Sequence, residues 1–288
     1  MFIKNYPLAR VTSLGVGGPA DFFIQPTTCD EVVQAQRFAL EHNIPLTIIG
    51  YGTNLLIRDG GIRGVVMQIA SPFANAHVDG TTLTATTGCL LGSLSKLALR
   101  HSLGGLEFAV GIPGGLGGAV FMNAGAYGGE IGPLVKSVQV VQNGKLLEWE
   151  KADLSFAYRS SRFQKENDTA IVTRVELELS PENKDIILQK MLDLQGQRRS
   201  KQPLEFPSAG STFKRPPGHY VGPLIEQAGL KGFRIGGAEV STKHAGFIVK
   251  TGAATAQDFL DLIHTIQKII FEKFQVRLDP EIRILGED

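Results

Sequence analysis

The segment from Gly111 to Glu130, GIPGGLGGAVFMNAGAYGGE, contains eight glycines in twenty residues. Glycine loses more backbone freedom on folding than any other residue, at about 0.5–1 kcal/mol per site relative to alanine inside a helix or strand. A folded chain accepts this loss in a flexible connector, or where another group must lie directly against the backbone. The segment is therefore either a linker or a loop that contacts a ligand.

The remaining composition is that of an ordinary globular protein. Hydrophobic residues make up 43% and charged residues 20% of 288 residues, which is long enough for two domains. The net charge of +1 creates no overall field that would attract nucleic acid or an anionic membrane. No apolar stretch resembles a signal peptide or a membrane span. Two cysteines, Cys29 and Cys89, make neither a disulfide framework nor a metal cluster, so we expect a cytoplasmic protein without a metal ion.

The first two hundred residues alternate between helical and strand patterns. Thr28 and Glu31 form a capping-box pair ahead of an amphipathic helix. Two hairpins are predicted, through Asp79-Gly80 and through Asn143-Gly144. We further expect buried strands at 45–50 and 64–69, a helix near 90–103, strands at 106–110 and 170–179, and a helix over 184–201.

The pattern changes after Pro203. Residues 203–218 are rich in proline and predict a rigid, extended connection at a domain boundary. Short strands at 245–250 and 281–285 flank a helix capped by Thr255 and Asp258. Regular βαβ alternation is not sustained, so the chain reads as an α+β domain of about 200 residues and a smaller α/β domain of about 85.

Two glycine-containing segments, 48–54 and 109–120, share one expected design. Each is predicted to follow a buried strand, so that backbone amides can face an anion with no Cβ in the way. Neither fits the G-x-x-x-x-G-K-[ST] or the G-x-G-x-x-G phosphate loop. Either segment alone is equally compatible with a tight structural turn. Together with MNAGAYGGE they favour a large ligand that has two phosphates and a long planar group.

Six motifs then occur in order along the chain: IIGYGTNLLIRDGGIRGVV, GIPGGLGGAVFMNAGAYGGE, YRSSRF, PSAGSTFKRP, IGGAEVSTKHAGFIV and PEIRILG. Together they closely resemble the UDP-N-acetylenolpyruvoylglucosamine reductase family, over nearly the whole chain. The resemblance implies an FAD-binding domain of the p-cresol methylhydroxylase (PCMH) type over residues 1–200, with subdomains of about 1–70 and 71–200. It implies a substrate-binding domain over residues 201–288.

The resemblance also implies FAD as the cofactor and NADPH as the electron donor. Neither glycine segment contains a histidine, the usual point of covalent flavin attachment on this fold, so we expect a non-covalent flavin. Tyr51 stands where the family usually has glycine. The matching cofactor residues are Gly50, Tyr51, Gly52, Thr53, Asn54, Leu55, Gly111, Ile112, Pro113, Gly114, Gly117, Gly118, Asn123, Ala124, Gly125 and Ala126.

Three residues match the family's catalytic positions. The reaction passes a hydride from flavin N5 to C3 of an enolpyruvyl group, and C2 then takes a proton. Arg159 would bind the carboxylate and stabilise the enolate, because its guanidinium suits two oxygens. Ser211 would deliver the proton with help from a nearby positive charge, and Glu281 would assist. Outside these motifs, the same residues would be read as a surface ion-pair arginine, a turn serine and an edge-strand carboxylate.

The uridine diphosphate of the substrate requires cations. Lys201, Lys214 and Arg215 are candidates, and Tyr158 is a candidate pocket residue, although Arg215 replaces the family's frequent asparagine. Arg198 and Arg199 are interpreted as an ordinary solvated helix end, and His244 as structural. The chain resembles the short form of the family, which lacks an inserted tyrosine loop, and we expect a monomer.

Two other functions stay open on the sequence. One is a different FAD-linked oxidase on the same fold, acting on a sugar or a hydroxy acid. The other is a flavin-binding module without turnover, although such a module would need none of the three catalytic candidates.

Overall fold

The computed structural model describes residues 2–165 and 169–288. The chain forms two compact units and passes between them within β2 (Pro19–Ile24), after Tyr51, within β5 (Ile62–Gln68) and near the end of α4 (Lys184–Lys201). The second unit is therefore built from three separate stretches of sequence. The first unit comprises residues 23–51 and 64–198, and the second comprises residues 2–22, 52–63 and 199–288.

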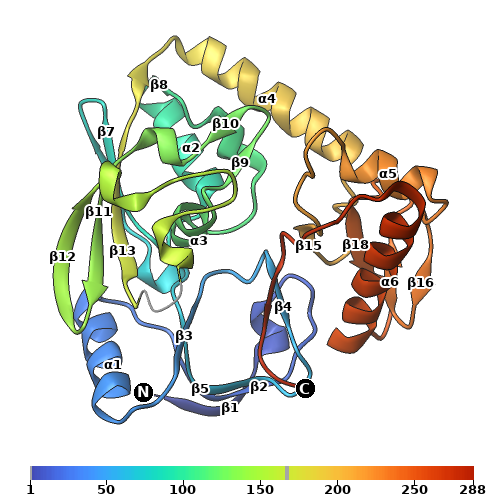
Figure 1. Cartoon of the computed structure of the whole chain (residues 1–288). Helices are drawn as coiled ribbons and strands as arrows, with labels where there is room; N and C mark the ends of the chain where they lie inside the picture. Colours follow the sequence, from blue (N-terminus) through green and yellow to red (C-terminus); the bar gives the residue numbers. More distant parts are fainter. Residues whose placement is uncertain (1, 166–168) are drawn as a thin grey trace. The chain divides into compact units, whose positions relative to one another are not determined.

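A five-stranded antiparallel sheet forms the centre of the first unit, in the order β12-β11-β13-β7-β6 (Figure 1). The hairpin through Asn143-Gly144 is confirmed, since both residues have positive φ (51° and 68°), as such a tight turn requires. The other hairpin also forms, but its turn lies one residue later than predicted, because Asp79 itself pairs with Thr82. The strands are β6 (Ala76–Asp79), β7 (Thr82–Thr86), β11 (Val135–Gln142), β12 (Lys145–Glu150) and β13 (Ile171–Glu178).

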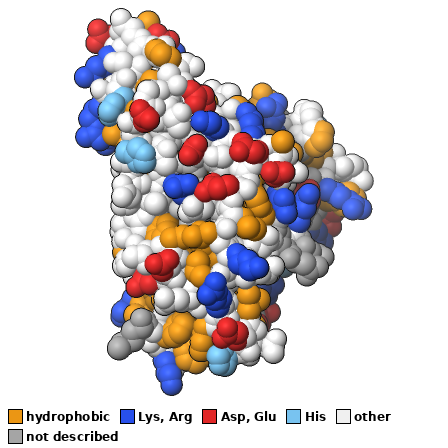
Figure 2. All heavy atoms as spheres, turned by 90° about the vertical axis from the view of Figure 1, so that its left-hand side faces the viewer, with side chains coloured by type: hydrophobic (Ala, Val, Ile, Leu, Met, Phe, Trp, Pro, Cys, Tyr) orange, Lys and Arg blue, Asp and Glu red, His pale blue; other side chains and the backbone are white. Residues whose placement is uncertain are grey.

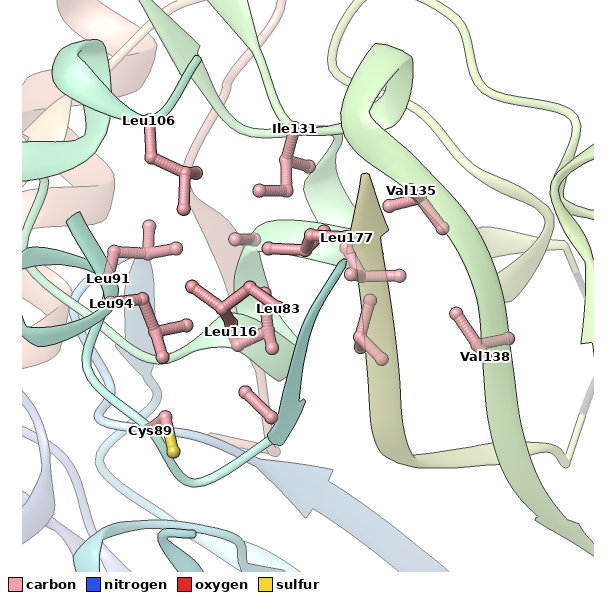
Figure 3. Close-up of a cluster of buried hydrophobic side chains, with 14 of the residues drawn as sticks. Leu83, Cys89, Leu91, Leu94, Leu106, Leu116, Ile131, Val135, Val138 and Leu177 are labelled. Carbon is pink, nitrogen blue, oxygen red and sulfur yellow. The ribbon is translucent and has the colours of Figure 1, made fainter. Parts of the chain in front are cut away.

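The main hydrophobic core of this unit lies between the sheet and two helices, α2 (Leu91–Arg100) and α3 (Leu116–Met122). In Figure 3, Leu94 of α2 and Leu116 of α3 point toward Leu83 and Leu177 of the sheet. All four side chains are at most 1% exposed. This packing fixes α3, which carries part of the glycine-rich segment.

A second, smaller core lies under α1 (Cys29–Glu41). The Thr28 cap is confirmed: its hydroxyl accepts a bond from the amide of Glu31 at 3.3 Å. The Glu31 carboxylate instead accepts from the amide of Thr27, at 2.6 Å. The strand β3 (Leu46–Ile49) pairs in parallel with β5, but only Ile49 is buried, since β3 lies at the sheet edge. The prediction of a buried strand is therefore wrong for most of β3.

Shorter elements and most of one long helix, up to Arg198, complete the first unit. The long helix α4 (Lys184–Lys201) packs Ile187 and Met191 against Val110. Two small antiparallel pairs are β8 (Leu103–Gly104) with β14 (Ser180–Pro181), and β9 (Gly125–Ala126) with β10 (Gly129–Glu130). The 3-10 turns are η2 (Ser71–Phe73), η3 (Glu107–Gly111), η4 (Gly132–Leu134), η5 (Lys151–Leu154) and η6 (Arg162–Gln164).

The second unit contains a four-stranded antiparallel sheet, β15-β18-β17-β16, packed on α6 (Ala256–Phe274). The predicted cap is confirmed, with Thr255 and Asp258 forming a reciprocal capping box. A separate parallel pair joins β4 (Leu55–Ile57) to β19 (Arg283–Leu285). The remaining elements are β1 (Ile3–Pro7), η1 (Leu8–Val11), β15 (Ser208–Ser211), α5 (Val221–Gln227), β16 (Arg234–Ile235), β17 (Ala238–Val240) and β18 (Phe247–Lys250).

The surface seen in Figure 2 mixes hydrophobic side chains with charges of both signs. Exposed hydrophobic residues of the first unit include Leu146 and Leu147 of β12. Within the two described ranges, none of the helices combines the length and apolar composition needed to cross a bilayer.

Candidate active site

The glycine-rich segment is an ordered, closely packed part of the first unit. It is preceded by the 3-10 turn η3, so the prediction of a strand at 106–110 is wrong. The Glu107 carboxylate accepts a bond from the amide of Gly105 at 2.7 Å, and the amide of Ala109 donates to the carbonyl of Leu106 at 3.1 Å. These local bonds curl the chain where a strand would extend it. The second glycine segment therefore follows a turn, whereas 48–54 follows β3 as predicted.

Several glycines in this segment are required by close contacts within the protein. A Cβ on Gly129 would lie 2.4 Å from Cδ1 of Phe108, and one on Gly125 would lie 2.5 Å from the carbonyl oxygen of Gly129. A Cβ on Gly117 would come within 3.0 Å of Thr87. Such packing excludes a flexible connector.

Other glycines face open space, which is what a bound planar ligand requires. A Cβ on Gly118 or Gly128 would meet no atom within 4 Å, and one on Gly50 would only reach the carbonyl oxygen of Ile69 at 4.0 Å. Gly118 is on the exposed side of α3. Two of the predicted cofactor positions, Gly50 and Gly118, therefore have the free space that FAD needs.

The two glycine segments meet in the first unit through Tyr51. Its hydroxyl donates to the carbonyl of Gly88 at 2.8 Å, and its ring lies 3.0 Å from the position of a Cβ on Gly115. Burial raises the pKa of the Tyr51 phenol above its ordinary value, so the hydroxyl stays protonated as a donor. Tyrosine in place of the family's glycine thus joins the loop after β3 to the start of α3.

Not every backbone amide near α3 is available to a ligand. The amide of Leu116 donates to the carbonyl of Cys89 at 2.9 Å, and that of Gly117 donates to the carbonyl of Thr87 at 3.1 Å. The predicted residues Ile112, Pro113 and Gly114 connect η3 to α3, and Ala124 and Ala126 lie just after α3.

The rest of the first loop belongs to the second unit. Gly52 has φ +66°, and a Cβ there would lie 2.1 Å from the carbonyl oxygen of Val11. Asn54 donates from Nδ2 to the carbonyl of Glu281 at 3.2 Å. Thr53 lies between these residues, and Leu55 begins β4. Gly52 and Asn54 thus have structural contacts of their own.

Arg159 lies in a tight turn of the first unit. Ala157 and Ser160 exchange two backbone hydrogen bonds of 3.0 Å, and Arg159 adopts a positive φ of 50° between them. Its Nη2 donates to the carbonyl of Gly125 at 2.9 Å, and its guanidinium lies 5.2 Å from the centre of the Tyr158 ring. The turn thus holds Arg159 beside the glycine-rich segment.

Asn123 anchors this turn from the end of α3. Its Nδ2 donates to the Ala157 carbonyl at 3.0 Å and to the Glu130 carboxylate at 3.1 Å, while its Oδ1 accepts from the amide of Gly132 at 2.9 Å. The residue is 2% exposed and adopts a left-handed conformation. The predicted cofactor residue Asn123 therefore uses its side chain inside the protein.

Ser211 and Glu281 are brought close together in the second unit, although seventy positions separate them in the sequence. Ser211 ends β15, and the pairing of β15 with β18 is irregular just before it. The amide of Glu281 donates to the carbonyl of Thr212 at 2.8 Å, and the amide of Lys214 donates to the carbonyl of Asp279 at 2.8 Å. Ser211 is exposed, and Glu281 and Lys214 are partly exposed, as reacting groups require.

The remaining candidates lie on both units. Tyr158 is 52% exposed in the first unit. Lys201 ends α4 and is exposed. The Arg215 guanidinium stacks 3.8 Å from the centre of the Tyr220 ring.

His244 is partly buried, accepts a bond from the Gly246 amide at Nδ1 over 3.1 Å, and lies against Phe247. Burial lowers the pKa of His244, which favours the neutral ring.

Arg198 is the residue that the sequence interpretation missed. A Cβ on Gly111 would lie 2.8 Å from Cδ of Arg198, so this side chain packs directly on the glycine-rich segment. The periodicity of α4 contained the signal, since Arg198 follows the buried Ile187 and Met191 at spacings of eleven and seven residues, on one helix face.

These features define an FAD-binding oxidoreductase class of protein: an α+β fold with a PCMH-type domain and a smaller C-terminal domain, as predicted. A family model for an FAD binding domain matches residues 20–149, and one for the UDP-N-acetylenolpyruvoylglucosamine reductase C-terminal domain matches residues 202–285. The chain belongs to the UDP-N-acetylenolpyruvoylglucosamine reductase family.

Similar proteins cover the full length of the chain. The UDP-N-acetylenolpyruvoylglucosamine reductase of Lactobacillus acidophilus is 50% identical over 286 residues, with 99% of this chain and 95% of the relative covered. That of Caldanaerobacter subterraneus subsp. tengcongensis is 49% identical, with 98% and 93% covered. The crystal structure of the Thermus caldophilus reductase (MurB) superposes with a TM-score of 0.85 at 34% identity, covering 99% of this chain and all of that one.

Proposed function

We propose that Arg159, Ser211 and Glu281 perform the chemistry of this family on its sugar-nucleotide substrate. The chain is an FAD-dependent oxidoreductase that uses NADPH to reduce UDP-N-acetyl-3-O-(1-carboxyvinyl)glucosamine to UDP-N-acetylmuramate, a peptidoglycan precursor. The observation that supports the residue assignment is the 2.8 Å bond between the amide of Glu281 and the carbonyl of Thr212, the residue that follows Ser211.

FAD would lie against the open glycines of the first unit, Gly50 and Gly118, and is proposed to be dissociable. When bound, FAD accepts a hydride from NADPH and supplies it to C3 of the enolpyruvyl group. The protein must then stabilise the negative charge at C2 and the carboxylate, and must protonate C2.

Arg159 suits the stabilising role. Its guanidinium stays charged at any working pH and offers a planar fork of donors to a carboxylate. The bond to the Gly125 carbonyl uses one donor on Nη2 and orients the group from the glycine-rich segment. Arg159 would bind the substrate carboxylate and hold the developing charge.

Ser211 suits protonation of C2 only with electrostatic help, because a free hydroxyl is a weak acid. Lys214 lies three residues after Ser211 in the sequence. Its amide donates a hydrogen bond to the Asp279 carbonyl, which fixes this stretch of chain. A positive charge at Lys214 would favour the serine alkoxide that forms as the proton leaves. Glu281, anchored by its amide to Thr212, would donate or accept a second hydrogen bond there.

Tyr158, Lys201, Lys214 and Arg215 are proposed to contact the substrate, with the lysines toward the diphosphate. Arg215 already stacks on Tyr220 and donates to the His219 carbonyl at 3.3 Å, so its contact would use the remaining guanidinium donors. Residues 1–200 would serve the cofactor and residues 201–288 the substrate. We further propose a cytoplasmic monomer, with no nucleic-acid or membrane partner, whose product supports cell shape, the cell cycle and division.

Stopped-flow spectroscopy of a Ser211→Ala variant tests this assignment. NADPH should bleach the flavin at the wild-type rate, whereas substrate should reoxidise it about 100-fold or more slowly, since a general acid contributes about 10²–10⁴-fold. Ser208→Ala, on the same strand β15, is the matched control and should behave as wild type. Undiminished reoxidation by Ser211→Ala would remove Ser211 from the mechanism. If the protein were instead an oxidase on the same fold, NADPH would not bleach its flavin.

A further inference from the structure

Arg198 occupies a fixed position on the glycine-rich segment. Its helix α4 is held to η3 by the buried cluster of Val110, Ile187 and Met191, and Val110 directly precedes Gly111. The Arg198 side chain crosses Gly111 so closely that a Cβ there would lie 2.8 Å from Cδ and 3.7 Å from Nε. The stem of the Arg198 side chain is therefore packed against the start of the glycine-rich segment, and the guanidinium lies beside that segment.

The charge of Arg198 has no counterpart in the protein. Within residues 2–165 and 169–288, the guanidinium has no hydrogen bond and no ion pair, and Tyr127 is the titratable group that acts on it. Burial lowers the pKa of Arg198 from its ordinary value, and Tyr127 only partly opposes this. Arg198 is partly exposed, and a cation that is partly removed from water gains free energy when it binds an opposite charge, because desolvation costs an unpaired ion free energy. An anionic ligand would supply the missing partner.

We propose that Arg198 is a cofactor-contacting residue whose guanidinium binds negative charge on the flavin dinucleotide, either its diphosphate or the pyrimidine edge of the reduced ring. The proposal rests on FAD lying along the glycine-rich segment. It assigns a function to a residue that the sequence suggested was part of a solvated helix end.

The surrounding residues favour the cofactor over the sugar nucleotide. Arg198 contacts Gly111 in the first unit, where Gly118 and Gly128 leave open space on the same segment. The other cations proposed for the substrate diphosphate, Lys201, Lys214 and Arg215, all belong to the second unit. Arg198 thus shares its unit with the cofactor residues of the glycine-rich segment.

An Arg198→Met variant tests the proposal, because methionine keeps the helix propensity and much of the apolar stem. Apoprotein would be titrated with FAD by flavin fluorescence, and the two-electron potential of the bound flavin would be measured. A diphosphate contact predicts FAD affinity about tenfold or more weaker at unchanged potential, as for a lost charge-assisted hydrogen bond. A contact with the flavin ring predicts that the affinity for oxidised FAD is unchanged while the affinity for reduced FAD falls. The two-electron potential should then be lower by about 30 mV for each tenfold loss of affinity for reduced FAD.

Arg199→Met is the matched control, since Arg199 is the adjacent, exposed arginine of the same helix. Arg199→Met should leave the FAD affinity and the potential of the bound flavin unchanged. Arg198→Lys keeps a cation, so its FAD affinity and flavin potential should lie between those of the wild type and Arg198→Met. If Arg198→Met folds poorly, this variant separates the loss of a charge contact from the loss of packing. Gly111→Ala displaces Arg198 and should change the same quantity as Arg198→Met.

Two results would overturn the proposal. One is an Arg198→Met protein with wild-type FAD affinity and potential. The other is unchanged flavin binding with a raised KM for the sugar nucleotide, which would assign Arg198 to the substrate. Both leave the NADPH-driven bleaching intact, so they are distinguishable from failure of the proposed function, in which the protein would bind no flavin at all.

Discussion

Replacing Asn123 with alanine should destabilise the first unit strongly. The change leaves the buried Gly132 amide without the partner it has at 2.9 Å, whereas the exposed Ala157 carbonyl keeps its bond from the Ser160 amide. Each buried polar group left unpaired costs about 1–3 kcal/mol. Alanine at the left-handed backbone conformation (φ 45°, ψ 57°) adds about 1–2 kcal/mol. The expected loss in the free energy of unfolding is therefore about 2 kcal/mol or more.

Denaturant unfolding of the FAD-loaded protein, followed by tryptophan fluorescence, measures this loss. The chain has one tryptophan, Trp149, which is buried in the first unit and stacks on Phe163. Asn123→Gly is the matched control, because glycine adopts the left-handed conformation freely and isolates the hydrogen-bond part. Both variants should also slow flavin reoxidation by substrate, since the turn carrying Arg159 loses its anchor. A loss below about 1 kcal/mol in Asn123→Ala would refute the reasoning, because it is less than one unpaired buried group costs.

Three further predictions follow from single positions. Gly118→Ala should keep or slightly raise the melting temperature of the apoprotein, since alanine suits the helix α3, but should weaken FAD binding. Gly129→Ala should lower the melting temperature of the apoprotein because its Cβ would clash with Phe108, and equal effects of the two changes on both measurements would contradict this. His244→Asn should flatten the pH dependence of the melting temperature. Burial lowers the pKa of His244 in the folded protein, so as the pH falls the unfolded chain takes up a proton before the folded one does. The wild-type protein therefore loses stability as the pH falls below about 6.5, the ordinary pKa of histidine. Asp59→Ala should lower the free energy of unfolding by about 1 kcal/mol, because the Asp59 carboxylate accepts hydrogen bonds from the amides of Ala256 and Gln257 at the start of α6. Urea denaturation measures this loss, and an unchanged midpoint would exclude a capping role.

Local chemistry made part of this fold predictable from the sequence. The Asn143-Gly144 turn and the Thr255–Asp258 capping box depend only on neighbouring residues, and both are confirmed. The prediction of a strand at 106–110 is wrong, because the Glu107 side chain captures a nearby amide and favours η3. The pairing of β4 with β19 was not predicted, since more than two hundred residues separate the strands and no local pattern encodes such a distant partner.

The candidate site could be predicted only as a set of residue types. The motifs named Arg159, Ser211 and Glu281, and they indicated that glycine would matter. They did not distinguish glycines that admit a ligand, such as Gly118, from those packed against protein atoms, such as Gly129, because the distinction depends on tertiary neighbours. Arg198 was misinterpreted for the same reason: a cation in the last turn of a helix is also favoured by the helix dipole.

The parallel pairing of β4 with β19 bears on the order of events during synthesis. A ribosome releases residues 55–57 more than two hundred residues before it releases their strand partner at 283–285. The helical and antiparallel parts of the first unit can condense while translation continues, but β4 must wait with its edge unpaired until residues 283–285 have left the ribosome. Nascent chains stalled before residue 283 should therefore leave this segment open to proteases and chaperones, and its protection should begin only after β19 has emerged.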